Sequence, residues 1–452
     1  MTEMREENRS LDRPLTMFER ALYHGEGFHV NVMTTVRISG EITEQQIRQA
    51  LARIQEKHTV LRCLVVQKGG RPWFVQQEQP APVPLRMIPR QTENDWLEAA
   101  TLESLKRFDG SRGPLARVVW LRGETVSELI LVCSHALCDG RSLMTLLREI
   151  LLLCDQPDAD IGDPTTLNSL DEVFPKEVLT DRHLQRRIRW KAAGAKLMLR
   201  LPRRATAWTY GKVYRCLWTL DEQASQLLVA RCKAEGTNVF AALGLSCMLA
   251  FRDACGPKHI ERFEAPVDFR RYLPNLRSDS LFAIAPTITL SLQELRNTAP
   301  GPAGFWEMAR ALRGRMSRKV EKLKSTVFPL FLGIEHLHDV YDRMAVYAQS
   351  KRAGRKVSLS YLGRVDGEQN YQKFRLEEIC DISAMMTPTP ANLIAIYSFD
   401  GRFYFSLSSD ESSLPYAKAL EIKEQIISTL HACVADFAIS GAMSVAVGAE
   451  AS

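Results

Sequence analysis

Short apolar runs alternate along this 452-residue chain with stretches in which apolar residues recur every three or four positions. The first pattern predicts β-strands, and the second predicts amphipathic helices. Before residue 155 we expect strands at residues 30–38, 58–66, 116–120 and 128–134, and helices at residues 15–24, 42–57, 97–105 and 141–153. Strands and helices in alternation are typical of an α/β fold.

A break in this pattern divides the chain. Residues 155–174 combine Asp, Pro, Gly, Thr and Ser without periodicity, as linkers do. The segment after it is strongly basic. We therefore expect an N-terminal half at residues 1–165, a linker with a basic helix at 166–204, and a C-terminal half at 205–452.

The C-terminal half repeats the style of the first. We expect strands at 212–219, 262–267, 285–292, 393–399 and 402–407, and helices at 222–234, 239–252 and 413–437. Thr237 is a candidate N-cap for the second of these helices, because its hydroxyl can accept a hydrogen bond from a free backbone N–H. The pair Asp400-Gly401 lies between two apolar runs and predicts a hairpin turn.

The composition is that of an ordinary globular protein and narrows the functional classes. Hydrophobic residues make up 45% of the chain, and no apolar run approaches the ~20 residues that a membrane-spanning helix needs. The net charge of +6 permits an anionic cofactor or membrane surface and does not require nucleic acid. Ten cysteines occur without a CxxC pair, and the opening residues are too polar for a signal peptide. We therefore expect reduced thiols and a cytoplasmic protein.

The clearest chemical signal lies where the strand at 128–134 ends. His135 follows the strand directly, and Asp139 and Gly140 precede the next helix. A side chain at such a point is held by rigid elements, as a reactive group must be. Histidine titrates near neutral pH and can take the proton of an attacking hydroxyl. The alternative interpretation is a histidine that only packs in the core.

Residues 134–140, with the sequence SHALCDG, resemble the HxxxDG signature of the superfamily of chloramphenicol acetyltransferase-like folds. That group includes nonribosomal-peptide condensation domains, alcohol acetyltransferases, plant BAHD acyltransferases, wax ester synthases and mycobacterial polyketide-associated acyltransferases. Residues 55–62, 108–117 and 266–270 are similar to further stretches typical of the group. Residues 358–365 resemble the SNxGxV stretch of its alcohol acetyltransferase and polyketide-associated branches.

The resemblance implies an α/β pseudo-dimer of two chloramphenicol acetyltransferase-like half-domains, with an active-site tunnel between them. It implies that His135 is the general base. It also implies that Asp139 has a structural role and pairs with an arginine of the second half, for which Arg270 is the candidate. Gly140 then lets the backbone approach the tunnel.

The same resemblance assigns four residues to the tunnel or the oxyanion region: Asp268, Ser360, Tyr361 and Gly363. Tyr361 stands where the family stretch has Asn. Condensation domains usually carry two histidines at the start of the motif, and here Ser134 replaces the first. This replacement favours ester formation over amide formation.

We therefore expect an O-acyltransferase that moves an acyl group from a CoA or carrier-protein thioester to an acceptor hydroxyl. Acyl-CoA or an acyl-carrier protein is then a co-substrate, and a carrier protein would act in trans. No bound cofactor, metal or nucleic acid is expected. Two alternatives stay open: an amide-forming, free-standing condensation protein, and a catalytically silent carrier-docking protein of the same fold.

Two basic segments each allow two interpretations. Residues 176–204 contain ten Lys or Arg against Glu177 and Asp181, with apolar residues such as Trp190 between them. This pattern predicts either a solvated helix that covers the linker or an interfacial helix in peripheral contact with an anionic membrane. Residues 310–324 form a second basic face, which is either solvated or a contact for CoA phosphates or an acidic carrier.

Overall fold

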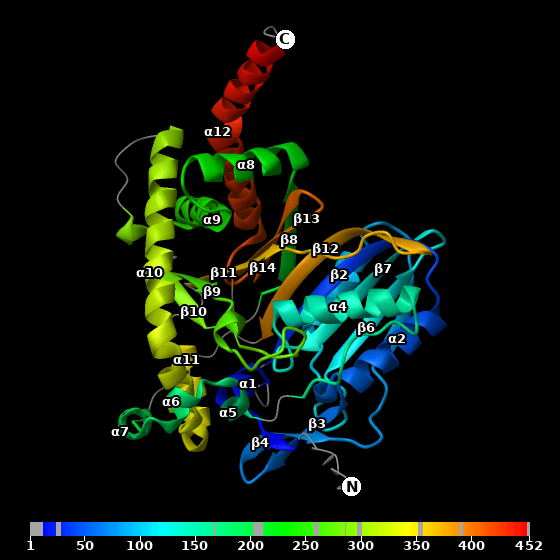
Figure 1. The fold of residues 1–452 in the computed structure, drawn as a ribbon, viewed down its shortest axis with the longest axis vertical. Coiled ribbons are helices and arrows are strands. Elements are labelled where there is room, and N and C mark those ends of the chain that lie inside the picture. The colour runs from blue at the N-terminus through cyan, green and yellow to red at the C-terminus, as the bar shows by residue number, and fades with distance from the viewer. Residues whose placement is uncertain are drawn as a thin grey trace, which may run out of the picture.

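Three β-sheets organise the chain, and helices cover them (Figure 1). One sheet has the strand order β12-β2-β7-β6-β5, a second has β10-β9-β11-β13-β14-β8, and a small third has β1-β4-β3. The computed structural model describes residues 12–23, 29–166, 169–201, 211–256, 262–284, 286–295, 301–350, 356–387 and 392–449. The α/β class expected from the sequence is confirmed.

The N-terminal sheet is built around two long antiparallel strands, β2 (His29–Gly40) and β7 (Val126–Ser134). It also contains β5 (Leu85–Pro89) and β6 (Ala116–Arg122). Two helices, α2 (Glu44–Lys57) and α4 (Gly140–Asp155), lie side by side across one face of this sheet (Figure 1). The third helix of this half is α3 (Asp95–Leu105). The small sheet beside it contains β1 (Arg13–Pro14), β3 (Cys63–Lys68) and β4 (Arg71–Gln76).

The C-terminal sheet has six strands. They are β8 (Val213–Leu220), β9 (Arg262–Pro266), β10 (Thr287–Leu290), β11 (Lys356–Arg364), β13 (Asn392–Phe399) and β14 (Arg402–Asp410). Its outer face packs against α8 (Glu222–Ala234), α9 (Val239–Cys255) and α12 (Tyr416–Ala449). The hairpin predicted at Asp400-Gly401 is confirmed, since both residues have positive φ, 46° and 75°, as this tight turn requires.

The remaining helices lie along one side of the molecule. The long helix α10 (Gly301–Glu335) runs next to α7 (Arg182–Leu199), and the shorter helices are α1 (Met17–Tyr23), α5 (Leu170–Val173), α6 (Lys176–Thr180) and α11 (Tyr341–Ser350). Among the described residues, no single helix is long and apolar enough to cross a membrane. Only α8 and α9, bent by 109° relative to each other, meet that test of length and composition as a pair.

Two local predictions are wrong. The expected strand at 58–66 begins with a 3-10 turn, Thr59–Arg62, and becomes a strand only at Cys63. The reason is that His58 ends helix α2 and its backbone carbonyl accepts from Leu61, which closes a turn. The N-cap of α9 is Asn238, whose side chain accepts from Ala241 N at 2.8 Å, and not Thr237.

One strand crosses from one half of the chain to the other. β12 (Phe374–Thr387) follows β11 of the C-terminal sheet in the chain but pairs along its whole length with β2. Arg215 of β8 and Asp381 of β12 are both fully buried and form an ion pair, Nε to Oδ2, at 3.3 Å. The division of the chain at residues 165 and 204 stays a prediction, and β12 is a strand of the expected C-terminal half that completes the other sheet.

Candidate active site

His135 emerges from the end of strand β7. The last residue of the strand, Ser134, is in register with Asn31 of β2, and the backbone N–H of His135 donates to the Val30 carbonyl at 2.8 Å. Leu137 N then donates to Ser134 O at 3.0 Å and closes a turn. The backbone at His135 is therefore fixed by two strands of the sheet, and its side chain is only partly exposed.

A backbone carbonyl determines the tautomer of His135. Its Nδ1 lies 2.8 Å from the carbonyl oxygen of Cys138. A carbonyl oxygen can only accept, so Nδ1 carries the hydrogen and Nε2 has a free lone pair. Burial lowers the pKa of His135 below its ordinary value, and the nearby Asp139 carboxylate opposes this shift in part. At neutral pH the imidazole is thus a neutral base with Nε2 ready to take a proton.

Asp139 caps helix α4 and does not orient the histidine. Its Oδ1 accepts from the backbone N–H of Ser142 at 2.9 Å, which makes it the N-cap of the helix. The same carboxylate binds Arg270, with Nη2 3.0 Å from Oδ1 and Nε 3.4 Å from Oδ2. The structure thus contains the ion pair predicted from the sequence, while the role of Asp139 in the reaction stays a prediction.

Arg270 joins the two halves of the chain at this point. Besides Asp139, its Nη2 donates to Ser142 Oγ and to Phe282 O, both at 2.7 Å, and its Nη1 donates to Ser280 O at 2.9 Å. The side chains of Arg270 and Asp139 are only 11% and 14% exposed. The guanidinium is therefore a fully bonded structural pin and has few donors left for a substrate.

Ser142 is a partner in this cluster that was not predicted from the sequence. Its hydroxyl donates to Asp139 and accepts from Arg270 and from Phe282 N. A serine three residues after an N-cap aspartate is a readable signal for a capping contact. The carbonyls of Ser280 and Phe282 had no such signal, because a backbone acceptor carries no residue preference.

Gly140 lies against the other half. A Cβ at this position would meet Leu362 Cδ2 of β11 at 2.9 Å. The absence of a side chain therefore allows the first turn of α4 to approach the C-terminal sheet.

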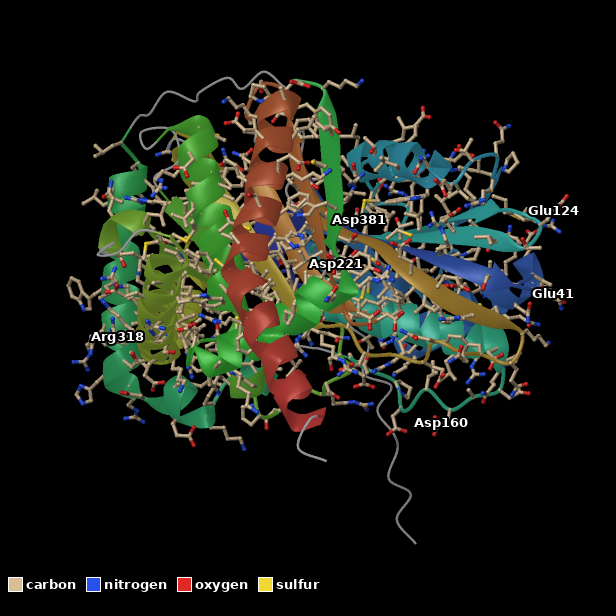
Figure 2. All side chains as sticks on the ribbon, turned by 90° about the horizontal axis from the view of Figure 1, so that it is seen from above. Glu41, Glu124, Asp160, Asp221, Arg318 and Asp381 are labelled. Atoms are coloured by element: carbon tan, nitrogen blue, oxygen red, sulfur yellow. The ribbon has the colours of Figure 1, made fainter. Side chains whose placement is uncertain are left out.

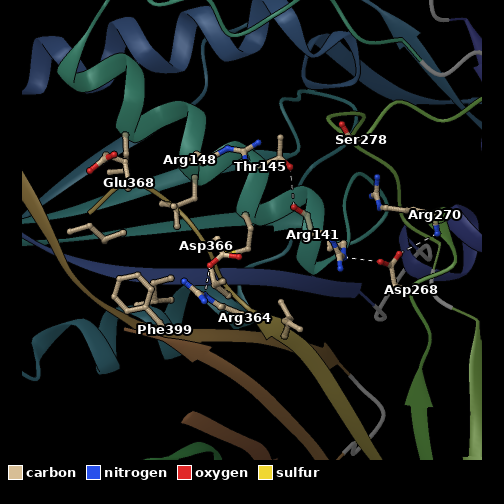
Figure 3. Close-up of a pocket in the computed structure, with 18 of the residues that line it drawn as sticks. Arg141, Thr145, Arg148, Asp268, Arg270, Ser278, Arg364, Asp366, Glu368 and Phe399 are labelled. Carbon is tan, nitrogen blue, oxygen red and sulfur yellow. Dashed lines mark hydrogen bonds and ion pairs between the residues drawn. The ribbon is translucent and has the colours of Figure 1, made fainter. Parts of the chain in front are cut away.

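A cavity of about 590 Å³ opens between α4 and the C-terminal half (Figure 3). At its edge Arg141 Nε lies 2.9 Å from Asp268 Oδ2, and Asp268 Oδ1 also accepts from the backbone N–H of Arg270. The cavity wall is rich in cations: Arg141, Arg148, Arg270, Arg271, Arg277 and Arg364. Three acidic residues oppose them: Asp268, Asp366 and Glu368. The predicted site residue Asp268 thus belongs to this cavity, whereas His135 is not among its lining residues.

The stretch around Ser360 separates into two faces of strand β11. Leu359 lies in the outer core, so alternation along the strand turns Ser360 toward the N-terminal half. Tyr361 turns outward again and stacks on Phe240 with ring centroids 5.2 Å apart. Gly363 has φ of 79° and follows a register shift in the pairing with β13. The structure therefore does not bring Tyr361 together with His135.

The inner face of the C-terminal sheet carries small polar side chains opposite the N-terminal half. Ser360 is in register with Ala395 of β13, which in turn is in register with Ser406 of β14. Tyr397 on the same face packs into the core of the N-terminal sheet, which shows what this face is turned toward. The hydroxyl oxygens of Ser406 and Ser408 are buried and have no hydrogen-bond partner among the described residues. These serines were not predicted from the sequence, although their alternation with apolar residues is visible in it.

The cysteines beside the histidine are not nucleophiles. Cys133 and Cys138 are both fully buried. The hydrogen bond to Cys133, together with burial, raises the pKa of the Cys138 thiol well above its ordinary value. In the part of the chain that the structure describes, no group of three or more His, Cys, Asp or Glu is placed to hold a metal ion.

Comparison with known proteins gives one family and several folds. The family model for the condensation domain matches residues 16–259. A protein of the linear gramicidin synthase of Brevibacillus parabrevis is 28% identical over 235 residues, which are 47% of this chain and 4% of that protein. The chain thus spans a small part of the curated relatives that it matches.

Two solved structures cover almost the whole chain. Polyketide synthase associated protein 5 from Mycobacterium tuberculosis superimposes with a TM-score of 0.61 at 15% identity, over 92% of this chain and 97% of that one. Trichothecene 15-O-acetyltransferase from Fusarium sporotrichioides gives a TM-score of 0.66 at 12% identity, over 93% and 95%. At these identities the likeness establishes the fold, and it confirms the acyltransferase-like α/β architecture of two half-domains.

Proposed function

Because the chain belongs to the condensation-domain family, we propose that it transfers an acyl group from a thioester to an acceptor hydroxyl, with His135 as the general base. The observation that supports this most directly is the hydrogen bond from His135 Nδ1 to Cys138 O at 2.8 Å. It leaves Nε2 unprotonated without help from a carboxylate. The lowered pKa of His135 supports the same role, since a base must be neutral before it acts.

The proposed reaction needs only one proton carrier. His135 Nε2 takes the hydroxyl proton as the oxygen attacks the thioester carbonyl carbon. The tetrahedral intermediate then collapses, the C–S bond breaks, and the departing thiolate takes the proton back from the imidazolium. Among the residues predicted for the oxyanion region, Ser360 is the candidate donor, because it lies on the sheet face turned toward the N-terminal half.

The arginine-rich cavity is the proposed approach for the donor. Six arginines against three acids make its wall cationic, and Arg recognises phosphate groups by bidentate hydrogen bonds. CoA and the phosphopantetheine arm of a carrier protein both bear phosphate next to the thioester-carrying chain. We therefore place either donor in this cavity, with its thiol end directed to the turn that holds His135.

Amide formation is the second candidate, because the curated relatives include a linear gramicidin synthase and a phosphinothricin tripeptide synthetase, a peptide-forming class of protein by name. Ser134 in place of the first histidine of the longer motif favours the hydroxyl acceptor.

The test offers the purified chain a panel of acyl-CoA and acyl-carrier donors together with matched alcohol and amine acceptors. Release of free thiol and the mass of the product are measured. We expect ester product, and we expect His135→Ala to lower the rate about 10²–10⁴-fold while the melting temperature is unchanged. The exposed His336 provides the matched control, and His336→Ala should keep full activity.

Three outcomes would contradict the proposal. Faster reaction of amines with inert alcohols would assign the chain to amide formation. An absence of thiol release with every donor, combined with binding of the carrier protein, would make it a silent docking protein. Full activity of a folded His135→Ala variant would exclude the general base.

A further inference from the structure

The most exposed large apolar side chains gather at one place on the surface. Among the described residues, Trp190 is 75% exposed, Leu197 is 69% exposed and Leu201 is 62% exposed, and these are the three highest values for large apolar side chains. The first two belong to helix α7, and the third follows its end. Isolated exposed apolar residues are common, but three within twelve positions need an explanation.

These three side chains form one stripe. Trp190 and Leu197 are seven residues apart, about two helical turns, so they project from the same side of α7. The opposite side of the helix is buried, at Ile188, Ala192 and Leu199. The helix therefore packs on the protein through one apolar face and presents a second apolar stripe outward.

Cations flank the stripe on both sides. Successive helical residues are about 100° apart, so Arg189 and Lys191 lie on opposite flanks of Trp190. Arg186 and Arg187 add charge one turn earlier, and all four side chains are exposed. None of the four has a carboxylate partner in the described part of the chain, in contrast to Lys196, which binds Asp339 at 2.8 Å.

An apolar groove lies beside this helix. A cavity of about 820 Å³ separates α7 from α10, and its wall is mostly apolar, with side chains such as Phe328, Leu330 and Ile334. Arg187, Lys191 and Lys324 also line it. Figure 1 shows α7 at the outer edge of the molecule, and Figure 2 shows the acidic Glu41 and Glu124 at the edge opposite to Arg318 of the neighbouring helix α10.

We propose that the outer face of α7, consisting of Trp190, Leu197, Leu201 and the flanking cations, docks on a membrane surface that contains anionic lipids. Trp is favoured at the boundary between headgroups and acyl chains, and Lys and Arg on both flanks match a plane of phosphates. A stripe flanked by cations on two sides fits a plane of negative charge better than a single acidic patch on a partner protein. The groove beside it is wide and apolar enough for a lipid chain.

This docking surface is independent of the proposed reaction. It lies on α7, beside α10, and none of its residues lines the cavity next to the HxxxDG turn. If membrane docking holds, the chain reaches its acceptor or releases its product at a membrane, to which it is attached by charge and by a shallow apolar insertion.

The experiment is flotation of the full chain with vesicles of phosphatidylcholine alone or mixed with phosphatidylserine. We expect binding only to the anionic vesicles, and binding should weaken as salt increases. The double variant Trp190→Ser with Leu197→Ser should reduce the bound fraction at least about tenfold, and so should Arg186→Glu with Arg189→Glu. Val229→Ser is the control, because Val229 is 48% exposed on the distant helix α8.

The variants are compared with the wild type at equal melting temperature, which shows that the fold is intact. Failure of the wild type to bind anionic vesicles would overturn the proposal, and so would unchanged binding by both double variants. Capture of an acidic carrier protein, lost in the same variants while vesicles do not bind, would reassign the surface to a protein partner.

Discussion

At the scale of single residues, the base at this site is oriented by an uncharged group. The Nδ1–H of His135 donates to a backbone carbonyl, and the nearest carboxylate, Asp139, is engaged by Arg270 and by the helix N-terminus. A carboxylate bonded directly to a histidine would stabilise its cation strongly. Here burial acts against the cation, and Asp139 acts on it only from a distance.

This arrangement predicts the pH dependence of the reaction. Since the reactive form is neutral and the pKa of His135 is lowered, kcat/KM should fall on the acid side with an inflection below the ordinary histidine value of about 6.5. Asp139→Asn removes a charge that raises this pKa, so the inflection should move to still lower pH. Asp268→Asn, which does not act on His135, should leave the inflection in place. An inflection above 7 in the wild type would show that the imidazole is not the titrating base.

The sequence predicted the charged members of this cluster and not the polar ones. Asp139 and Arg270 were recognisable because each lies in a stretch that resembles a family motif. Phe282 contributes a carbonyl and an N–H, which every residue possesses, so only the fold reveals it. Tyr361 was assigned to the tunnel region from its position in a motif, but the side on which a strand residue projects depends on register.

At the scale of elements, strand β11 shows where periodicity stops being informative. A register shift lies between Tyr361 and Gly363, and it lets Leu362 reach Gly140 of the other half. An irregularity of this kind adds a residue to one strand without changing composition, so apolar periodicity cannot locate it. The long, regular strands β2, β7, β13 and β14 were predicted within a few residues, because each buries apolar side chains along its length.

Two glycines in open surroundings should respond to the same substitution with opposite sign. A Cβ on Gly363 or on Gly194 would meet nothing within 4 Å. Gly363 has φ of 79°, where a side chain is strained, so Gly363→Ala should lower the free energy of unfolding by about 1–2 kcal/mol. Gly194 lies inside helix α7, so Gly194→Ala should raise it by about 0.5–1 kcal/mol. Urea unfolding measures both changes, and the same sign for the two would contradict the backbone account.

At the scale of the whole molecule, ion pairs join the two halves at three points. Arg270 binds Asp139, Arg141 binds Asp268 at 2.9 Å, and Lys57 Nζ binds Asp279 Oδ2 at 3.0 Å. The pairs differ in burial: the first is nearly enclosed, while Arg141 and Asp268 are 63% and 40% exposed. Their contributions to stability should differ in the same order.

The junction can be tested by removing one partner of each of two pairs. Asp139→Asn should lower the free energy of unfolding by about 3–5 kcal/mol, because it leaves a buried guanidinium unpaired. Asp268→Asn is the matched control at an exposed pair and should cost about 0–1 kcal/mol. Thermal and urea unfolding of the two variants give the comparison. Equal losses would show that Arg270 does not depend on its carboxylate partner.

The overall architecture could be predicted from the sequence, but the exchange of β12 between the halves could not. The fold class followed from alternating strands and helices and from motifs in both halves. The pairing of β12 with β2 joins segments that are far apart in the chain, and local pattern carries no information about such a choice of partner.

Strand β12 also imposes an order on the birth of the protein. During synthesis, residues 29–40 leave the ribosome long before residues 374–387, which cover the edge of β2 in the finished molecule. Until those residues emerge, a twelve-residue edge of N–H and C=O groups stands open, and an open edge is a template for pairing with another chain. Domains usually fold in the order in which they are translated. Here the first sheet to be made is among the last to be completed, so the nascent chain must be protected from aggregation for most of its translation.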